Sequence, residues 1–88
     1  MLKIVTKRDS STGAVLYLDG HVVGPWVVEL GRVCESLLSG GSRVELDLTN
    51  VAFVSREGVE LLSKLCERHV RLLHCSAFVI EQLKAHRR

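Results

Sequence analysis

Residues 44–59 read VELDLTNVAFVSREGV, and this stretch decides the fold. Its first five residues alternate valine or leucine with an acidic side chain, which is the pattern of a strand with one buried face. Residues 49–54 then predict a short loop, and Ser55 is a good N-cap for a helix. Four apolar side chains repeat behind it at helical spacing: Val59, Leu62, Leu65 and Cys66. The stretch is therefore predicted to be a strand, a loop and a helix start.

In α/β folds, ligands and partners bind where a strand ends and the next helix begins. The first candidate site is therefore the helix start at Ser55, Arg56, Glu57 and Gly58. Ser55 is interpreted as a structural cap, as a phosphorylation target or as both, and Glu57 complements the positive helix end. Glycine inside a helix costs about 1 kcal/mol relative to alanine. Gly58 therefore indicates close packing against the preceding loop or the close approach of a partner.

Length and composition predict one soluble domain over residues 1–88, because 47% apolar residues are ample for a core. The net charge of +2 is too small to indicate a nucleic-acid binder, and the basic residues 84–88 are expected to be a solvated helix end. Three cysteines without paired spacings favour reduced thiols and a cytoplasmic location. No apolar run approaches ~20 residues, and no signal-peptide pattern opens the chain.

Upstream of the central stretch, residues 2–7 and 14–19 predict two strands. The turn-forming residues 8–13 between them imply an antiparallel hairpin. A helix is then expected from Pro25, which suits the first helical position, to a left-handed C-cap at the glycine pair 40–41. Its apolar stripe has gaps of three and four residues: Trp26, Val27, Leu30, Val33, Cys34, Leu37 and Leu38.

Downstream, the second helix is expected to run to about His69, and residues 70–75 predict a fourth strand. Ser76 can cap a last helix over residues 77–86, whose inward side chains would be Val79, Ile80 and Leu83. The element order is then β-β-α-β-α-β-α. Strands that alternate with helices are joined by right-handed crossovers. The predicted fold class is therefore α/β, with a mostly parallel four-stranded sheet and an antiparallel edge strand.

The third strand alternates apolar and charged residues, whereas a parallel strand covered on both faces reads as a continuous apolar run. We therefore expect the helices mainly on one face of the sheet. The open face can bind a partner or a second copy of the chain, or it can simply be solvated. It would show these side chains: Tyr17, Val5 or Val15, Arg43, Glu45 and Asp47.

The chain offers little for catalysis, so neither an enzymatic activity nor a cofactor is expected. Ser55 lacks the Gly-x-Ser-x-Gly setting of a nucleophile, and Glu57 would be a weak base. Buried cysteines and polar histidines at element edges are the favoured interpretation of the remaining reactive side chains. A metal site could be imagined only at four residues, whose spacing matches no zinc pattern: Cys66, His69, His74 and Cys75.

The central stretch resembles the signature of STAS domains, the domains of bacterial anti-sigma-factor antagonists and of sulphate-transporter tails. That signature reads roughly Asp-Leu-Ser-x-Val-x-Phe-Ile-Asp-Ser-Ser-Gly-Leu. The matching residues here are DLTNVAFV at 47–54, Gly58-Val59 and Leu61-Leu62. Residues 18–20 are also similar to the family's Leu-x-Gly before its first helix, and the resemblance extends through the fourth strand. The order of elements agrees with it independently.

In such antagonists, the serine just before the glycine accepts phosphate from a partner anti-sigma kinase, which switches their binding. Glu57 occupies that position here, so the resemblance implies that the acceptor is lost to a residue resembling phosphoserine in charge. Ser55 and Arg56 occupy the places of the preceding Asp-Ser, so Ser55 is not carried over as the acceptor. Many STAS domains have a further strand and helix. The resemblance therefore implies either a trimmed domain or an exposed sheet edge.

The resemblance implies a non-catalytic, protein-binding regulatory module without the usual serine phosphoswitch. The partner would be an anti-sigma factor or a kinase-like protein, with no nucleic acid and no direct membrane insertion. The alternative is an accessory subunit of a bacterial lipid-transport ATPase, which small STAS proteins also serve, and a nucleotide-binding regulatory domain is a third class. The partner-binding residues are expected to be Thr49, Asn50, Ser55, Arg56, Glu57 and Gly58.

Overall fold

The order of elements along the chain is the predicted β-β-α-β-α-β-α. The computed structural model describes residues 1–8, 10 and 12–86. Asp9 and Ser11 of the predicted turn, and Arg87 and Arg88 of the basic tail, lie outside the described residues. The elements are β1 (Leu2–Arg8), β2 (Gly13–Val22), α1 (Pro25–Ser39), β3 (Arg43–Val54), α2 (Arg56–Glu67), β4 (Arg71–Leu73) and α3 (Ala77–His86).

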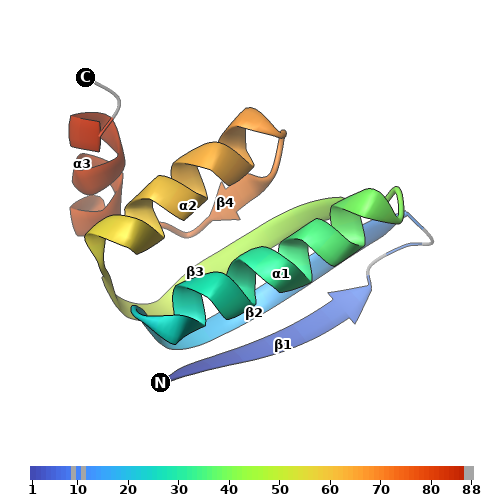
Figure 1. Cartoon of the computed structure of the whole chain (residues 1–88), viewed down its shortest axis with the longest axis horizontal. Helices are drawn as coiled ribbons and strands as arrows, with labels where there is room; N and C mark the ends of the chain where they lie inside the picture. Colours follow the sequence, from blue (N-terminus) through green and yellow to red (C-terminus); the bar gives the residue numbers. More distant parts are fainter. Residues whose placement is uncertain (9, 11, 87–88) are drawn as a thin grey trace.

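The sheet has the strand order β1-β2-β3-β4. β1 pairs antiparallel with β2 at one edge, whereas β2 with β3 and β3 with β4 pair in parallel. Figure 1 shows α1 and α2 over the same face of this sheet, with α3 beside α2. The predicted mostly parallel sheet with an antiparallel edge strand, and with helices mainly on one face, is therefore confirmed.

The core lies between this face of the sheet and the helices. In the first half of β3, the buried Val44, Leu46 and Leu48 alternate with the half-buried Glu45 and Asp47, as the sequence predicts, because every second side chain of a strand turns toward the same face. Within the described residues, no helix combines the length and apolarity that a membrane span needs. The largest core side chains are at most 2% exposed: Leu16, Leu18, Leu30, Leu46, Leu48 and Leu62.

Helix α1 begins and ends as its sequence predicts. Pro25 occupies the first helical position, and the stripe behind it is buried or half-buried. The left-handed residue at its end is Gly41, with φ of 88°, while Gly40 is the C-cap. The N–H groups of Gly41 and Ser42 donate to the carbonyls of Leu38 and Leu37, both at 3.0 Å. This is a Schellman motif, which satisfies carbonyls that would otherwise lack a partner.

The predicted loop at residues 49–54 is wrong, because these residues continue strand β3. β2 also extends beyond its predicted end at Asp19, and the added residues of the two strands pair from Asp19↔Asn50 to Val22↔Val54. Two register irregularities interrupt this pairing. They explain why the regular alternation is lost after Leu48, since a bulge changes the face to which a side chain points.

Four smaller predictions in the C-terminal half also differ from the structure. Cys66 is exposed, because the buried face of α2 is formed by Gly58, Val59, Leu62 and Leu65, and the next residue is rotated by about 100°. α2 ends at Glu67, since His69 adopts a left-handed φ of 69°. β4 contains only Arg71–Leu73, so Cys75 follows the strand. In α3, Val79 is buried as predicted, but Ile80 is 40% exposed.

We predict that Leu30→Ala lowers the free energy of unfolding by about 2–5 kcal/mol, because it leaves a cavity in a closed core. Leu30 has no exposed surface, whereas Val28 on the same helix is 72% exposed. Val28→Ala is therefore the control and should change stability by less than ~0.5 kcal/mol. The measurement is unfolding in denaturant. A loss below ~0.5 kcal/mol for Leu30→Ala would contradict this placement of α1.

Candidate functional site

The junction between β3 and α2 is a capped helix start. Ser55 has an extended backbone, with φ of −74° and ψ of 172°, and its Oγ accepts a hydrogen bond from the Gly58 N–H at 3.2 Å. Its carbonyl also accepts the first intrahelical bond, from the Val59 N–H at 2.9 Å. Ser55 is therefore the predicted N-cap, and its side chain has a structural task.

The same junction is fixed to the end of strand β2. The Ser55 N–H donates to the carbonyl of Val22 at 3.0 Å. Gly58 is buried against this point: a Cβ on Gly58 would lie 2.8 Å from the Val22 carbonyl oxygen and 2.7 Å from Val54 Cγ1. Of the two explanations that the sequence left open for this glycine, packing against the strands accounts for it fully.

The first turn of α2 presents charged side chains outward. Arg56 and Glu57 are exposed, and the Arg56 Nε lies 3.9 Å from a carboxylate oxygen of Glu60. Glu57 occupies the turn in which the helix dipole is positive, so its charge is stabilised where it stands. Ser55, Arg56, Glu57 and Gly58 are thus brought together, with the middle two available at the surface.

Thr49 and Asn50 are also exposed, but they belong to the strand that leads to the helix start. At about 3.3 Å per strand residue, Asn50 lies roughly 15 Å from Ser55. The Thr49 hydroxyl and N–H donate to Asp47 Oδ1 at 2.6 and 2.9 Å, and these bonds hold the pKa of Asp47 below its usual value. Thr49 and Asn50 can therefore contact only the outer part of a partner centred on the helix start.

A groove of about 510 Å³ adjoins the helix start, between α2 and α3. The Gln82 Nε2 of α3 donates to the Val54 carbonyl at 3.3 Å, which attaches α3 to the end of β3. Phe53 remains 45% exposed at this groove. Among the residues that line it, the only ionisable groups are the basic side chains of Arg56 and His86, while the others are Phe53, Val54, Val59, Gln82 and Ala85.

Sequence reasoning missed this groove. The aromatic side chain of Phe53, next to the candidate helix start, was the available signal. The contribution of Gln82 and His86 depends on where α3 packs, and no local pattern indicates that.

The imagined metal site is not supported by the structure. No group of three or more potential ligands that could hold a metal ion occurs within the described residues. His74 instead lies 3.9 Å from a carboxylate oxygen of Asp47. Cys34 is buried in the core, and its burial raises the pKa of the thiol to about 11. It is therefore protonated at neutral pH and packs as an apolar side chain.

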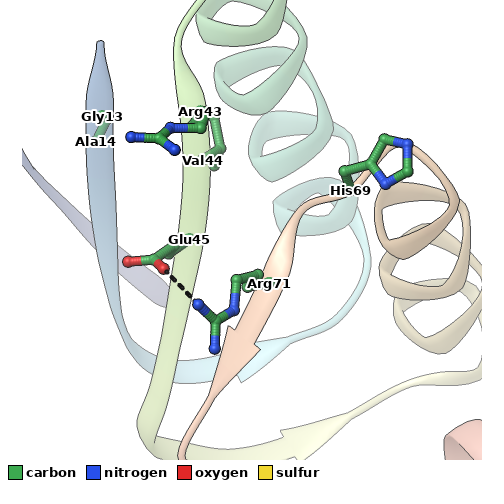
Figure 2. Close-up of a pocket in the computed structure, with 7 residues that line it drawn as sticks. All are labelled: Gly13, Ala14, Arg43, Val44, Glu45, His69 and Arg71. Atoms are coloured by element: carbon green, nitrogen blue, oxygen red, sulfur yellow. Dashed lines mark ion pairs between the residues drawn. The ribbon is translucent and has the colours of Figure 1, made fainter.

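A second, smaller pocket of about 260 Å³ lies at the opposite end of the parallel strands. Figure 2 shows that the guanidinium groups of Arg43 and Arg71 point to different places rather than toward one another. Arg71 instead forms an ion pair with Glu45, at 3.7 Å. These side chains do not converge on a common point, so the helix start remains the candidate site.

Comparison with solved structures shows the fold of the chain. The anti-sigma factor antagonist SpoIIAA in its unphosphorylated form is similar with a TM-score of 0.74 and 16% identity, over 93% of this chain and 82% of that one. A STAS-domain antisigma-factor antagonist from Rhodobacter sphaeroides gives 0.65 and 14%, over 82% and 85%. An uncharacterized DUF3478 protein from Shewanella loihica PV-4 with a SpoIIAA-like fold gives 0.60 and 17%, over 88% and 69%.

No family model and no curated protein sequence matches the chain. At these low identities, the structural likeness shows the fold alone. The chain has the SpoIIAA-like fold of STAS domains, which confirms the fold that the sequence resemblance implied.

We predict that Gly58→Ala lowers the free energy of unfolding by about 1–3 kcal/mol, although alanine is normally the better helix former. The added methyl group would overlap the Val22 carbonyl, a backbone atom that cannot rotate away. Gly31→Ala is the control, because its Cβ would meet only the flexible end of Leu61, at 3.3 Å. Gly31→Ala should lower the free energy of unfolding by less than Gly58→Ala does. An increase in stability for Gly58→Ala in denaturant unfolding would contradict the packing described here.

Proposed function

We propose that this chain is a cytoplasmic, non-catalytic regulatory module that binds a protein partner through the helix start at residues 55–58. The single observation that carries the proposal is the capped and buried attachment of this helix start to the strand ends, which holds Arg56 and Glu57 at the surface. A preformed contact surface of this kind loses little conformational freedom on binding. The fold shared with two anti-sigma-factor antagonists supports a regulatory role.

The groove beside the helix start extends the proposed contact surface. Phe53 offers an exposed aromatic side chain, and Arg56 and His86 place basic groups along the groove. Aromatic and arginine side chains contribute strongly to binding energy in protein interfaces. A partner segment with an apolar side chain and a neighbouring carboxylate would complement this groove. Thr49 and Asn50 would lie at the edge of such an interface.

Glu57 is proposed to act as a permanent negative charge at the contact surface. It is exposed, so it can reach a partner, and it lies directly before the buried glycine. Phosphoserine would carry up to two charges and three acceptor oxygens, whereas glutamate carries one charge and two oxygens. The mimicry is therefore partial. Ser55 is a poor substitute as a phosphate acceptor, because its hydroxyl oxygen already accepts the capping bond from Gly58.

The partner is proposed to be an anti-sigma factor or a kinase-like protein. A subunit of a lipid-transport ATPase is the competing partner, and the same helix start would serve as its contact. Purification of the chain with its partner from the native host distinguishes the two. A histidine-kinase-like protein supports partner switching, and transporter subunits support the alternative.

We predict that Glu57→Gln changes the affinity for the partner tenfold or more, equivalent to about 1.4 kcal/mol. Glu57→Ser should do the same and should also make binding sensitive to phosphorylation by the partner kinase. The competing explanation, in which Glu57 only complements the helix dipole, predicts a stability loss of ~0.3–1 kcal/mol with unchanged binding. The measurements are denaturant unfolding and calorimetric titration of the purified partner.

Glu67→Gln provides a matched control, because Glu67 is an exposed carboxylate in the last turn of the same helix. Its affinity for the partner should equal that of the unmodified chain. Equal affinities for all four forms would rule out the fixed-charge role of Glu57.

A further inference from the structure

The groove between α2 and α3 combines apolar contact surface with basic groups. Phe53 is 45% exposed in it, and two buried valines adjoin it. Among the described residues that line the groove, Arg56 and His86 are the only ionisable ones, and both are exposed. Arg56 lies 3.9 Å from Glu60, but a guanidinium has five N–H donors, so some remain for a second carboxylate. The groove therefore favours an occupant that is both apolar and anionic.

Gln82 adds an acceptor that lacks a donor. Its Nε2 donates to the Val54 carbonyl at 3.3 Å, and this bond fixes the orientation of the amide, because a carbonyl can only accept. The Gln82 Oε1 is buried and accepts no hydrogen bond from any described residue. Buried polar atoms in folded proteins nearly always have a partner, so this acceptor marks a position where a donor is missing. Since Gln82 lines the groove, an occupant of the groove can supply that donor.

We infer that the groove binds a short extended segment of the partner protein and holds the backbone of that segment at Gln82. An apolar side chain of the segment packs on Phe53, a neighbouring carboxylate contacts Arg56, and a backbone N–H donates to the Gln82 Oε1. The segment is extended rather than helical, because the N–H groups inside a helix are already bonded within the helix. The inference rests on the proposed function, since it assigns a second contact of the same partner beside the helix start.

The openness of the groove favours a chain segment over a small molecule. Four of the side chains that line it are exposed: Phe53, Arg56, Ala85 and His86. A small-molecule site encloses roughly 70–90% of its ligand, and a groove with so much of its lining exposed does not enclose a ligand in this way. A peptide segment needs no enclosure, because its two ends continue into the rest of the partner.

Titration of the purified, ¹⁵N-labelled full chain with the peptide acetyl-Gly-Leu-Asp-Gly-amide, followed by NMR, tests the inference. We expect the side-chain amide signals of Gln82 and the backbone signals of residues 53–59 to shift. Replacing the aspartate of the peptide by asparagine, or its leucine by glycine, should each weaken binding about fivefold or more, because the charge or the apolar contact is lost. Methylation of the leucine or the aspartate amide nitrogen removes one backbone donor, and at least one of these two peptides should bind as weakly.

Variants of the chain place the peptide in the groove. Phe53→Ala and Arg56→Gln should each weaken binding of the Leu-Asp peptide about fivefold or more. Phe78→Ala is the control for the first, because Phe78 is 56% exposed but does not line the groove. Arg68→Gln is the control for the second, because Arg68 is an exposed arginine at the other end of α2. Both controls should bind the peptide like the unmodified chain.

The inference is overturned if the Leu-Asp peptide causes no shifts up to ~10 mM, or if it binds no more tightly than its asparagine counterpart. It is also overturned if both N-methylated peptides bind like the parent peptide, since the contact with Gln82 would then be absent. Failure of the proposed function gives a different result. Glu57 does not line the groove, so partner binding that ignores Glu57 would reject the role of the helix start while peptide binding persists.

Discussion

The attachment of the α2 start to the end of β2 is the contact on which the rest of the site depends. The Ser55 N–H bonds to the Val22 carbonyl, and Gly58 leaves no space between the helix and this carbonyl. A larger residue at this point would move the helix away from the strands. The helix would then lose its position over the core, where Leu62 is fully buried. A single residue without a side chain therefore determines both the packing of α2 and the exposure of its first turn.

The position of α3 follows from the same contact. Gln82 reaches the Val54 carbonyl, which lies directly before the cap at Ser55. The groove between α2 and α3 therefore opens beside the helix start, and Arg56 of the helix start lines it together with His86 of α3.

The sequence allowed the element order, the Ser55 cap and the buried face of α1 to be predicted, because these features depend on local patterns. The extension of β3 through residues 49–54 was missed, since it depends on the matching length of β2 and on two irregularities in their pairing. The predicted burial of Cys66 was also wrong. Leu65 and Cys66 both fit the apolar stripe of the sequence, and only the packing of α2 shows that Leu65 is the buried one. The sequence left two explanations for Gly58, close packing and the approach of a partner. The position of the Val22 carbonyl next to Gly58 favours packing, and this contact between distant segments has no local sequence signal.

The most direct test of a preformed helix start is native-state hydrogen exchange of the Ser55 amide. If the bond to Val22 anchors α2 to the strands, this amide should be protected nearly as strongly as that of Leu46 in the central strand β3. It should also lose protection only with global unfolding, since the core and the helix start form one unit. Rapid exchange at Ser55, with Leu46 still fully protected, would show that the helix start opens independently. That result would contradict a site held rigidly by the ends of β2 and β3.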